Sequence, residues 1–271
     1  TINGIDDNCD QPSVDCDRGS VSVDLMAEYN SSFSFYGETL TTLNLSANGL
    51  IYGPDGFVGA ACPDCPQPLP SSAELNQLLA GLWRDIDMSS GNGQWYHAVV
   101  SNLLTNPAEQ VLYVNWHNAG QFGAPLASSR HAIAIMLDGQ SEPAGRVYYI
   151  YDSINNRDLI SSEGFSIGTE NKTGTEGTQV AFAPCASAAC IDSPAIGTLP
   201  NDETTLRLDP DIVGGSSAKV FTFQVRITGS TGTLLTNRVD VTSDGPITQQ
   251  TAVSDTLITV RRYLPLILKS P

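Results

Sequence analysis

Charged side chains are scarce in this sequence, and positively charged ones are the scarcest. Asp, Glu, Lys and Arg make up 15% of the 271 residues, with 13 basic against 29 acidic side chains and a formal net charge of −16 at pH 7. Nucleic acids and anionic membrane surfaces attract proteins through clustered basic residues. The charge balance therefore excludes both as expected partners, and it is compatible with divalent cations.

Long apolar runs are missing as well. No run approaches the roughly 20 consecutive apolar residues of a membrane-spanning helix, so we expect no membrane span. Thr, Ser, Gly and Asn are abundant instead. This composition favours strands joined by turns over helices with charged outer faces, and a chain of this length can bury one large core or two modest ones. An all-β fold is expected.

Recognisable catalytic patterns are also lacking. His97, His117 and His131 show no HExxH-type spacing. Residues 164–168, Gly-Phe-Ser-Ile-Gly, match the GxSxG pattern of a nucleophile elbow, but the polar, glycine-rich residues after them cannot form the helix that this elbow requires. Ser166 is therefore not expected to be a nucleophile. We expect no enzyme and rank a secreted hydrolase as the third interpretation.

Cysteine is present as three close pairs, which are Cys9 with Cys16, Cys62 with Cys65, and Cys185 with Cys190. An even number of locally paired cysteines is typical of disulfides formed outside the cytosol. Cys62 and Cys65 have CxxC spacing, but prolines surround them, so a structural disulfide is favoured over a redox centre. We expect an extracellular or cell-surface protein whose signal peptide has been removed, because the sequence begins at Thr1 without Met.

The first 20 residues form an acidic, disulfide-bearing segment. Its candidate metal ligands are Asp6, Asp7, Asn8, Asp10, Asp15 and Asp17. Calcium takes about six to eight oxygen ligands in proteins, so Ca²⁺ is a candidate here. A solvated acidic terminus held by a Cys9–Cys16 disulfide is the alternative, and no other cofactor is expected.

The central stretch is residues 79–87, Leu-Ala-Gly-Leu-Trp-Arg-Asp-Ile-Asp. The two-residue period of a strand places Trp83 with Asp85 and Asp87 on one face, and Leu82 with Arg84 on the other. We expect Trp83 in the core and the two carboxylates at a sheet rim. There they could form a glycosidase pair, although such carboxylates more often hydrogen-bond turns or bind a cation.

Further strands follow from alternation and turn signals. The Asn48-Gly49 dipeptide between two apolar runs predicts a hairpin, and one short helix is expected over Ser71–Leu79. Other expected strands are Ser32–Gly37, Gln94–Val100, Gln110–His117, His131–Leu137, Arg146–Tyr151, Gly164–Gly168, Gln179–Phe182, Lys219–Thr228, Leu234–Thr242 and Thr256–Val260. These give a sandwich over 21–183, a linker with a disulfide over 184–204, a smaller β unit over 205–262 and an apolar tail over 263–271.

Aromatic and asparagine residues offer weaker indications. Tyr148, Tyr149 and Tyr151 with Trp95 and Trp116 could line a sugar platform, but ordinary alternation of core and surface aromatics explains them more simply. Three sequons are candidate glycosylation sites, at Asn30, Asn44 and Asn171. Chance matches are expected in a chain so rich in Asn, Ser and Thr.

A series of short motifs carries a family resemblance. The motifs are Phe35-Tyr-Gly37, the Asn48-Gly49 turn, Gly81–Asp87, Val114-Asn-Trp116, Ile133–Gly139, Val147–Tyr151 and Ser166–Gly177. In this order the chain resembles the nidogen-like (NIDO-like) β-sandwich domain of secreted bacterial surface proteins. Residues 205–262 resemble the closing half of an immunoglobulin-like repeat of prokaryotic surface proteins. The resemblance implies adhesion, matrix or surface-layer roles and brings no catalytic residues.

The C-terminal stretch Ile258–Leu268 is β-prone and has no acidic side chain. An unpaired strand of this kind is a sticky edge. We expect it to complete or dock on a sheet of a neighbouring copy, through Tyr263, Leu264, Leu266, Ile267 and Leu268. Folding back on its own chain is the alternative. The first interpretation is thus a structural subunit of a surface filament, layer or matrix, and the second is an adhesin or carbohydrate-binding module with a glycan or protein partner.

Overall fold

The computed structural model describes residues 19–56, 66–72, 75–88, 93–101, 110–139, 145–185, 193–209, 234–241 and 250–257. The chain divides into two compact units, Thr1–Phe221 and Thr222–Pro271. In the described part of the chain, no helix has the length and apolar character that crossing a membrane requires.

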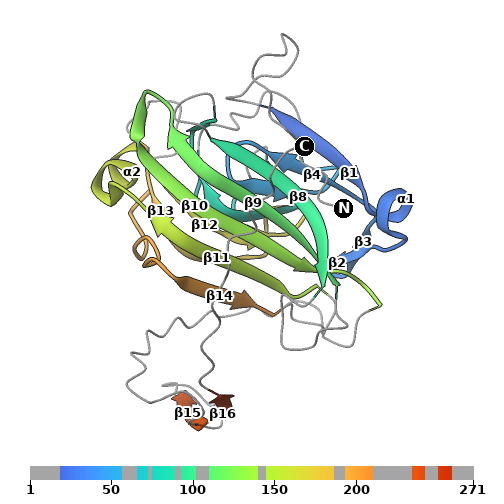
Figure 1. Cartoon of the computed structure of the whole chain (residues 1–271). Helices are drawn as coiled ribbons and strands as arrows, with labels where there is room; N and C mark the ends of the chain where they lie inside the picture. Colours follow the sequence, from blue (N-terminus) through green and yellow to red (C-terminus); the bar gives the residue numbers. More distant parts are fainter. Residues whose placement is uncertain are drawn as a thin grey trace, which may run out of the picture. The chain divides into compact units, whose positions relative to one another are not determined.

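The first unit is an antiparallel β-sandwich, as the sequence predicts (Figure 1). The order in its first sheet is β1-β4-β5-β6-β12-β13. These strands are β1 (Ser20–Asp24), β4 (Thr42–Ser46), β5 (Leu50–Tyr52), β6 (Leu78–Trp83), β12 (Phe165–Glu170) and β13 (Gly177–Ala183).

The second sheet has the order β14-β11-β10-β9, and β9 then pairs with both β7 and β8. These strands are β14 (Thr204–Leu208), β11 (Val147–Ile154), β10 (Ala124–Met136), β9 (Gln110–Gln121), β8 (Gln94–Ser101) and β7 (Ile86–Asp87). A separate hairpin pairs β2 (Phe33–Phe35) with β3 (Glu38–Leu40). The first unit also holds two short helices, α1 (Leu25–Tyr29) and α2 (Arg157–Glu163), which the alternation pattern did not predict.

The main core lies between the two sheets. Alternate residues of the long strands enter it, among them Leu112, Val114 and Trp116 of β9 and Ile133 and Ile135 of β10. Polar atoms of three buried aromatic side chains join the sheets: Tyr149 Oη donates to Gly168 O at 2.7 Å, Tyr151 Oη to Gly81 O at 2.5 Å, and Trp116 Nε1 to Ser46 O at 3.0 Å. The strand period therefore predicts the inward faces correctly.

The central stretch departs from expectation in one respect. It is not one strand, because β6 ends at Trp83 in the first sheet and β7 begins at Ile86 in the second. The chain crosses between the sheets at Arg84 and Asp85. The prediction that Trp83, Asp85 and Asp87 share the face of a single strand is therefore wrong.

Trp83 is buried, as expected, with 1% of its surface exposed. It belongs to a second apolar cluster that includes Leu50, Leu78 and Ala80, and Leu69 and Leu75 complete this cluster. Leu75 lies in the segment where we expected a helix, and Leu69 precedes that segment. Leu75 makes an isolated bridge and Leu78 already starts β6, so the helix prediction over Ser71–Leu79 is wrong for the described residues. Burial of its leucines against β6 outweighs the local helical preference.

The Asn48-Gly49 hairpin is confirmed, since β4 and β5 pair around it. The expected end of the sandwich at residue 183 moves to Leu208, because β14 pairs with β11 along its whole length. The sequence pattern instead assigns β14 to the smaller β unit predicted over 205–262.

In the second unit, β15 (Leu234–Val241) pairs antiparallel with β16 (Gln250–Leu257). The first strand was predicted at this position, and the second begins earlier than the predicted Thr256. The predicted strand Lys219–Thr228 lies outside the described residues, and the immunoglobulin-like fold of this unit stays a prediction.

Candidate functional site

Several predicted site residues lie outside the described part of the chain. They are the candidate calcium ligands Asp6, Asp7, Asn8, Asp10, Asp15 and Asp17, the cysteines Cys9, Cys16, Cys62, Cys65 and Cys190, and the assembly residues Tyr263, Leu264, Leu266, Ile267 and Leu268. Cys185 is described and is disulfide-bonded, while its predicted pairing with Cys190 stays a prediction. Within the described ranges, no group of three or more His, Cys, Asp or Glu side chains could hold a metal ion.

The three candidate glycosylation sites have different surroundings. Asn30 is exposed at the C-terminal end of α1. Asn44 is half-buried in β4, with its amide nitrogen 3.4 Å from Gly53 O. Asn171 lies in the loop between β12 and β13, where its Oδ1 accepts hydrogen bonds from Thr173 Oγ1 and from the backbone N–H of Thr175.

Ser166 is not on an elbow but inside β12, fully buried, where its Oγ accepts from Gln179 Nε2 at 3.2 Å. The aromatic residues of the possible sugar platform also separate. Tyr149, Tyr151, Trp95 and Trp116 are buried in the core, whereas Tyr148 lies on the outer face of the second sheet. The fold does not assemble a platform, and these positions agree with the simpler interpretation of alternating core and surface aromatics.

A buried polar cluster occupies the crossing between the sheets. Arg84 is fully buried and donates to Gln121 Oε1 at 2.7 Å and to Ser129 Oγ at 3.0 Å. Ser129 Oγ is 3.1 Å from His131 Nδ1, and the His131 ring stacks on Trp116 with centroids 5.1 Å apart.

Burial lowers the pKa of Arg84 to about 9. Burial, and then the charge of Arg84, hold the pKa of His131 well below its usual range. This cluster is buried and joins the crossing segment after β6 to β9 and β10, so it holds that segment against the second sheet.

Among the described strands, the candidate for new contacts is the outer edge of β8. This strand has eight residues, pairs with β9 on one side, and has no strand on its other side among the described residues. Figure 1 shows β8 at one margin of the second sheet and β14 at the opposite margin. An unpaired edge presents a row of backbone N–H and C=O groups that can bind another strand.

The side chains of β8 do not protect this edge. Its sequence, Gln-Trp-Tyr-His-Ala-Val-Val-Ser, contains no Lys, Arg, Asp, Glu or Pro, the residues that usually block strand addition. Trp95 and Val99 pack into the main core, so the strand is firmly anchored. Val100 joins Tyr113, Tyr148 and other side chains on the outer face.

The other described edges are shorter or protected. β1 has five residues and ends in Asp24, and β14 has five residues and carries Arg207, which is 2.8 Å from Asp209. β13 has seven residues, but Phe182 is bridged to Ile196 on its free side. Of these edges, β8 is the longest and the only one of the four described that lacks both charge and cover.

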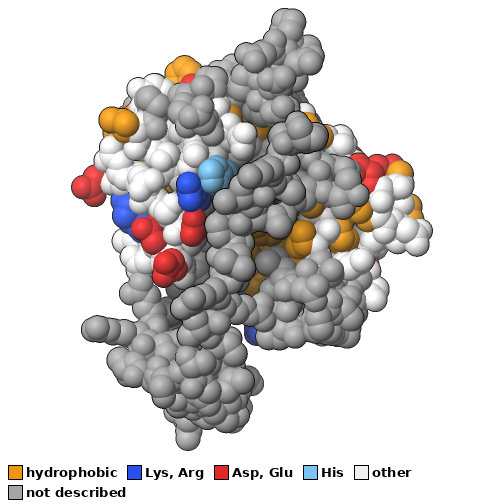
Figure 2. Space-filling view, in the orientation of Figure 1, with side chains coloured by type: hydrophobic (Ala, Val, Ile, Leu, Met, Phe, Trp, Pro, Cys, Tyr) orange, Lys and Arg blue, Asp and Glu red, His pale blue; other side chains and the backbone are white. Residues whose placement is uncertain are grey.

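The electrostatic surroundings of β8 are mildly acidic. His97 Nε2 is 3.9 Å from Glu28 Oε2 of α1. Burial lowers the pKa of His97, and Glu28 partly opposes this effect. Figure 2 shows hydrophobic side chains on the face of the molecule turned to the viewer, together with acidic and basic side chains beside a histidine. On the second sheet, Arg130 and Asp152 form an ion pair at 3.7 Å. Burial, and then the charge of Arg130, lower the pKa of His117, and the charge of Asp152 partly opposes this effect.

Sequence reasoning predicted β8 as a strand but did not identify it as an edge. The signal that could have identified the edge is the absence of charged side chains over Gln94–Ser101.

Comparison with known protein families finds one that matches this chain. A family model described as NIDO related matches residues 27–210, which is more than half of the chain. Searches among curated proteins and among solved structures find no significant match.

Proposed function

This chain belongs to the NIDO-related family, and from that membership and the open edge of β8 we propose that it is an extracellular structural protein that assembles with copies of itself. The assembly is a filament, layer or matrix at a bacterial cell surface. In each copy, the part of the chain after residue 221 adds an immunoglobulin-like unit. The observation that supports this proposal is an anchored, uncharged edge strand that has no strand on its other side within the described ranges. An added strand would gain backbone hydrogen bonds there, and alternate side chains would give specificity.

The proposed donor is the segment Ile258–Leu268 of a second copy. Its composition suits an added strand, because it is rich in β-branched and apolar residues. Pro265 would leave one hydrogen-bonding position unused, which an edge strand tolerates.

Charge also favours this donor. Residues 258–271 contain three basic and no acidic side chains, in a chain whose net charge is −16. Such a segment is attracted to the body of another copy. Among the edges it prefers β8, with Glu28 nearby, over β14, where Arg207 projects on the outer face.

The test compares two single lysine substitutions on the outer face of the second sheet. Tyr96→Lys places a charge on β8, and Thr205→Lys places the same charge on β14 at the opposite margin. We expect the full-length chain to form assemblies visible by electron microscopy and light scattering. Tyr96→Lys should weaken association by about tenfold, or about 1.4 kcal/mol, while Thr205→Lys leaves it unchanged.

Removal of residues 263–271 should prevent assembly without changing the unfolding temperature of the sandwich. A full-length chain that stays monomeric up to about 1 mM would rule the proposal out. Equal effects of the two lysine substitutions would exclude β8 as the acceptor.

A further inference from the structure

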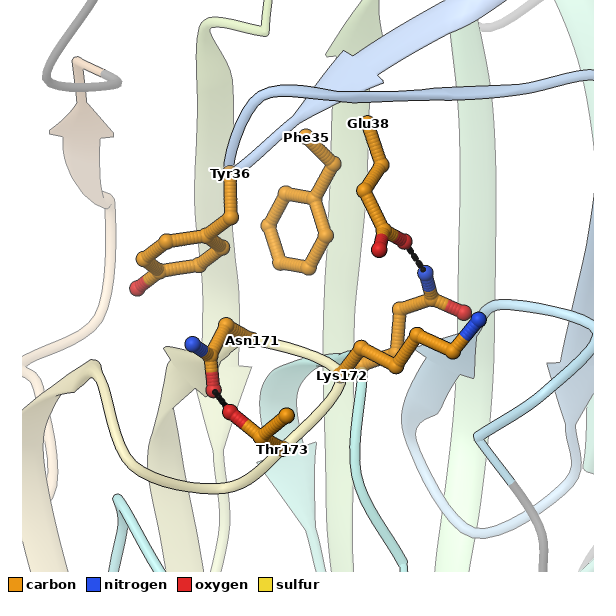
Figure 3. Close-up of a pocket in the computed structure, with 7 residues that line it drawn as sticks. Phe35, Tyr36, Glu38, Asn171, Lys172 and Thr173 are labelled. Carbon is orange, nitrogen blue, oxygen red and sulfur yellow. Dashed lines mark hydrogen bonds between the residues drawn. The ribbon is translucent and has the colours of Figure 1, made fainter. Parts of the chain in front are cut away.

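A second surface, which includes no residue of β8, has the features of a ligand site. A hollow of about 100 Å³ lies between the turn joining β2 to β3 and the loop joining β12 to β13 (Figure 3). We call it the hairpin pocket, and it is lined by Phe35, Tyr36, Glu38, Gln77, Asn171, Lys172 and Thr173. Its volume is well below the roughly 300–1,000 Å³ of drug-sized sites. It therefore suits one small ring rather than an extended ligand.

The aromatic wall is built at a conformational cost. Tyr36 and Gly37 have φ values of +48° and +79°, the pattern of a two-residue type I′ turn. Asn, Asp or Gly normally fills the first position, and an aromatic residue there is strained. The Tyr36 hydroxyl is held 2.8 Å from Thr169 Oγ1, and its ring meets that of Phe35 edge to face with centroids 4.8 Å apart. The fold thus keeps a partly exposed aromatic ring where a small polar residue would be favoured.

The facing wall offers both hydrogen-bond acceptors and donors. Glu38 Oε2 accepts from Gln77 Nε2 at 2.5 Å, which positions the carboxylate beside the Phe35 ring in Figure 3. Lys172 Nζ lies on the same side as Glu38 in Figure 3, 2.6 Å from Asp55 Oδ2, and this contact leaves two further N–H donors on the ammonium group. The carboxylate is held by Gln77, which also lines the hollow, and the ammonium group is held by Asp55 outside it.

Asn171 is oriented in the same way. Its Oδ1 accepts from Thr173 Oγ1 at 3.2 Å and from Thr175 N at 3.1 Å. The amide nitrogen is consequently directed toward the Tyr36 side of the pocket (Figure 3). This nitrogen lies 3.5 Å from Thr175 Oγ1, at the limit of a hydrogen bond.

The charged side chains that line the pocket limit which class of ligand can bind. An anion would meet the Glu38 carboxylate in a chain with a net charge of −16, and a cation would meet the Lys172 ammonium group. A neutral ring with several hydroxyl groups satisfies both, because each hydroxyl can donate to the carboxylate and accept from an N–H. Its C–H face can pack on an aromatic ring.

We propose that the hairpin pocket binds one neutral sugar residue, with the Tyr36 ring as the packing surface and Glu38, Asn171 and Lys172 as hydrogen-bonding partners. The sugar would be a terminal residue of an extracellular glycan, since the hollow is small and open. This site is independent of the β8 edge, and an assembled protein could present it on every copy.

The type I′ turn supplies a test in which folding and binding are separable. Tyr36→Asn removes the ring but places a residue that this turn prefers, so the fold should be retained. The probes are glucose, galactose, mannose and N-acetylglucosamine, examined with the full-length chain by saturation-transfer difference NMR and by titration of amide chemical shifts. We expect at least one sugar to bind with a dissociation constant of about 1–10 mM.

Tyr36→Asn should reduce that affinity at least tenfold. Glu38→Gln, which can keep the hydrogen bond from Gln77, should also reduce it. The matched control is Phe122→Asn, which removes an exposed aromatic ring from the turn between β9 and β10 and should leave binding unchanged. The proposal is overturned if none of the four sugars binds the unmodified chain at about 50 mM, or if Tyr36→Asn binds as well as the parent.

Discussion

Glu170 at the end of β12 shows how burial changes the chemistry of a single residue. Its side chain is fully buried, and Oε2 accepts a hydrogen bond from Ser71 N at 2.8 Å. Burial raises the pKa of Glu170 to about 8, against the opposing effect of that hydrogen bond. The carboxyl group is therefore protonated at neutral pH, and an ionised form would be costly in this position.

Stability should depend on pH through this residue. Between the pKa of the unfolded chain, near 4.5, and the folded value of about 8, the folded state holds a proton that the unfolded state releases. The free energy of unfolding therefore falls as pH rises, by up to about 1.4 kcal/mol per pH unit. Glu170→Gln should remove this contribution, so that the variant loses less stability than the parent between pH 5 and pH 8 in urea titrations.

The control for this experiment is Glu163→Gln, which changes an exposed carboxylate at the end of α2. It should keep the slope of the parent chain. If Glu170→Gln and the parent show parallel pH profiles, the buried carboxyl group is already ionised and the argument is incorrect.

At the scale of elements, the distance between neighbouring backbone segments decides which turn residues can be substituted. The hairpin of β4 and β5 turns at Gly49, whose φ is +77°. A Cβ atom there would lie 2.2 Å from Leu82 O and 3.2 Å from His131 Nε2. The turn thus fits against the crossing segment and the buried polar cluster, and glycine is required by both conformation and space.

Gly49→Ala should destabilise the sandwich by about 3 kcal/mol, because it adds a backbone collision to an unfavourable φ. The matched variant is Gly37→Ala, whose φ of +79° is almost the same but whose Cβ would have nothing within 4 Å. It should cost only about 1 kcal/mol. Chemical denaturation of the two variants measures the difference, and equal losses would show that the close contact at Gly49 is easily relieved.

For the whole molecule, the dominant property is its charge. With 29 acidic and 13 basic side chains, the folded chain repels itself and repels other copies. Several described ion pairs, such as Arg130 with Asp152 and Arg157 with Asp202, are surface contacts, and pairs of this kind contribute little. Salt should therefore change stability mainly by screening the net repulsion, and less by weakening individual ion pairs.

We expect the unfolding temperature to rise by about 2–5 °C when NaCl is increased from about 10 mM to about 300 mM, because the Debye length shortens. Association of copies, measured by light scattering, should increase over the same range. Calorimetry at several salt concentrations checks the first effect. A falling unfolding temperature would mean that attractive surface pairs outweigh the net repulsion.

Local pattern was sufficient for the all-β class, for most strands of the sandwich and for the turn at Asn48-Gly49, because alternation and turn chemistry act over a few neighbouring residues. It also predicted that Trp83 is buried. It did not predict that the chain changes sheets at Arg84, because a strand period carries no information about which sheet a strand joins.

The tertiary structure alone decided the features on which the two proposals depend. β8 is an edge because, among the described strands, it pairs only with β9, and the hairpin pocket exists because Tyr36 lies beside a loop about 135 residues away in sequence. Pairing and packing between distant segments are set by the global burial of apolar surface. The sequence by itself determined the strands, and the packing of those strands determined which edges and side chains remain available for binding.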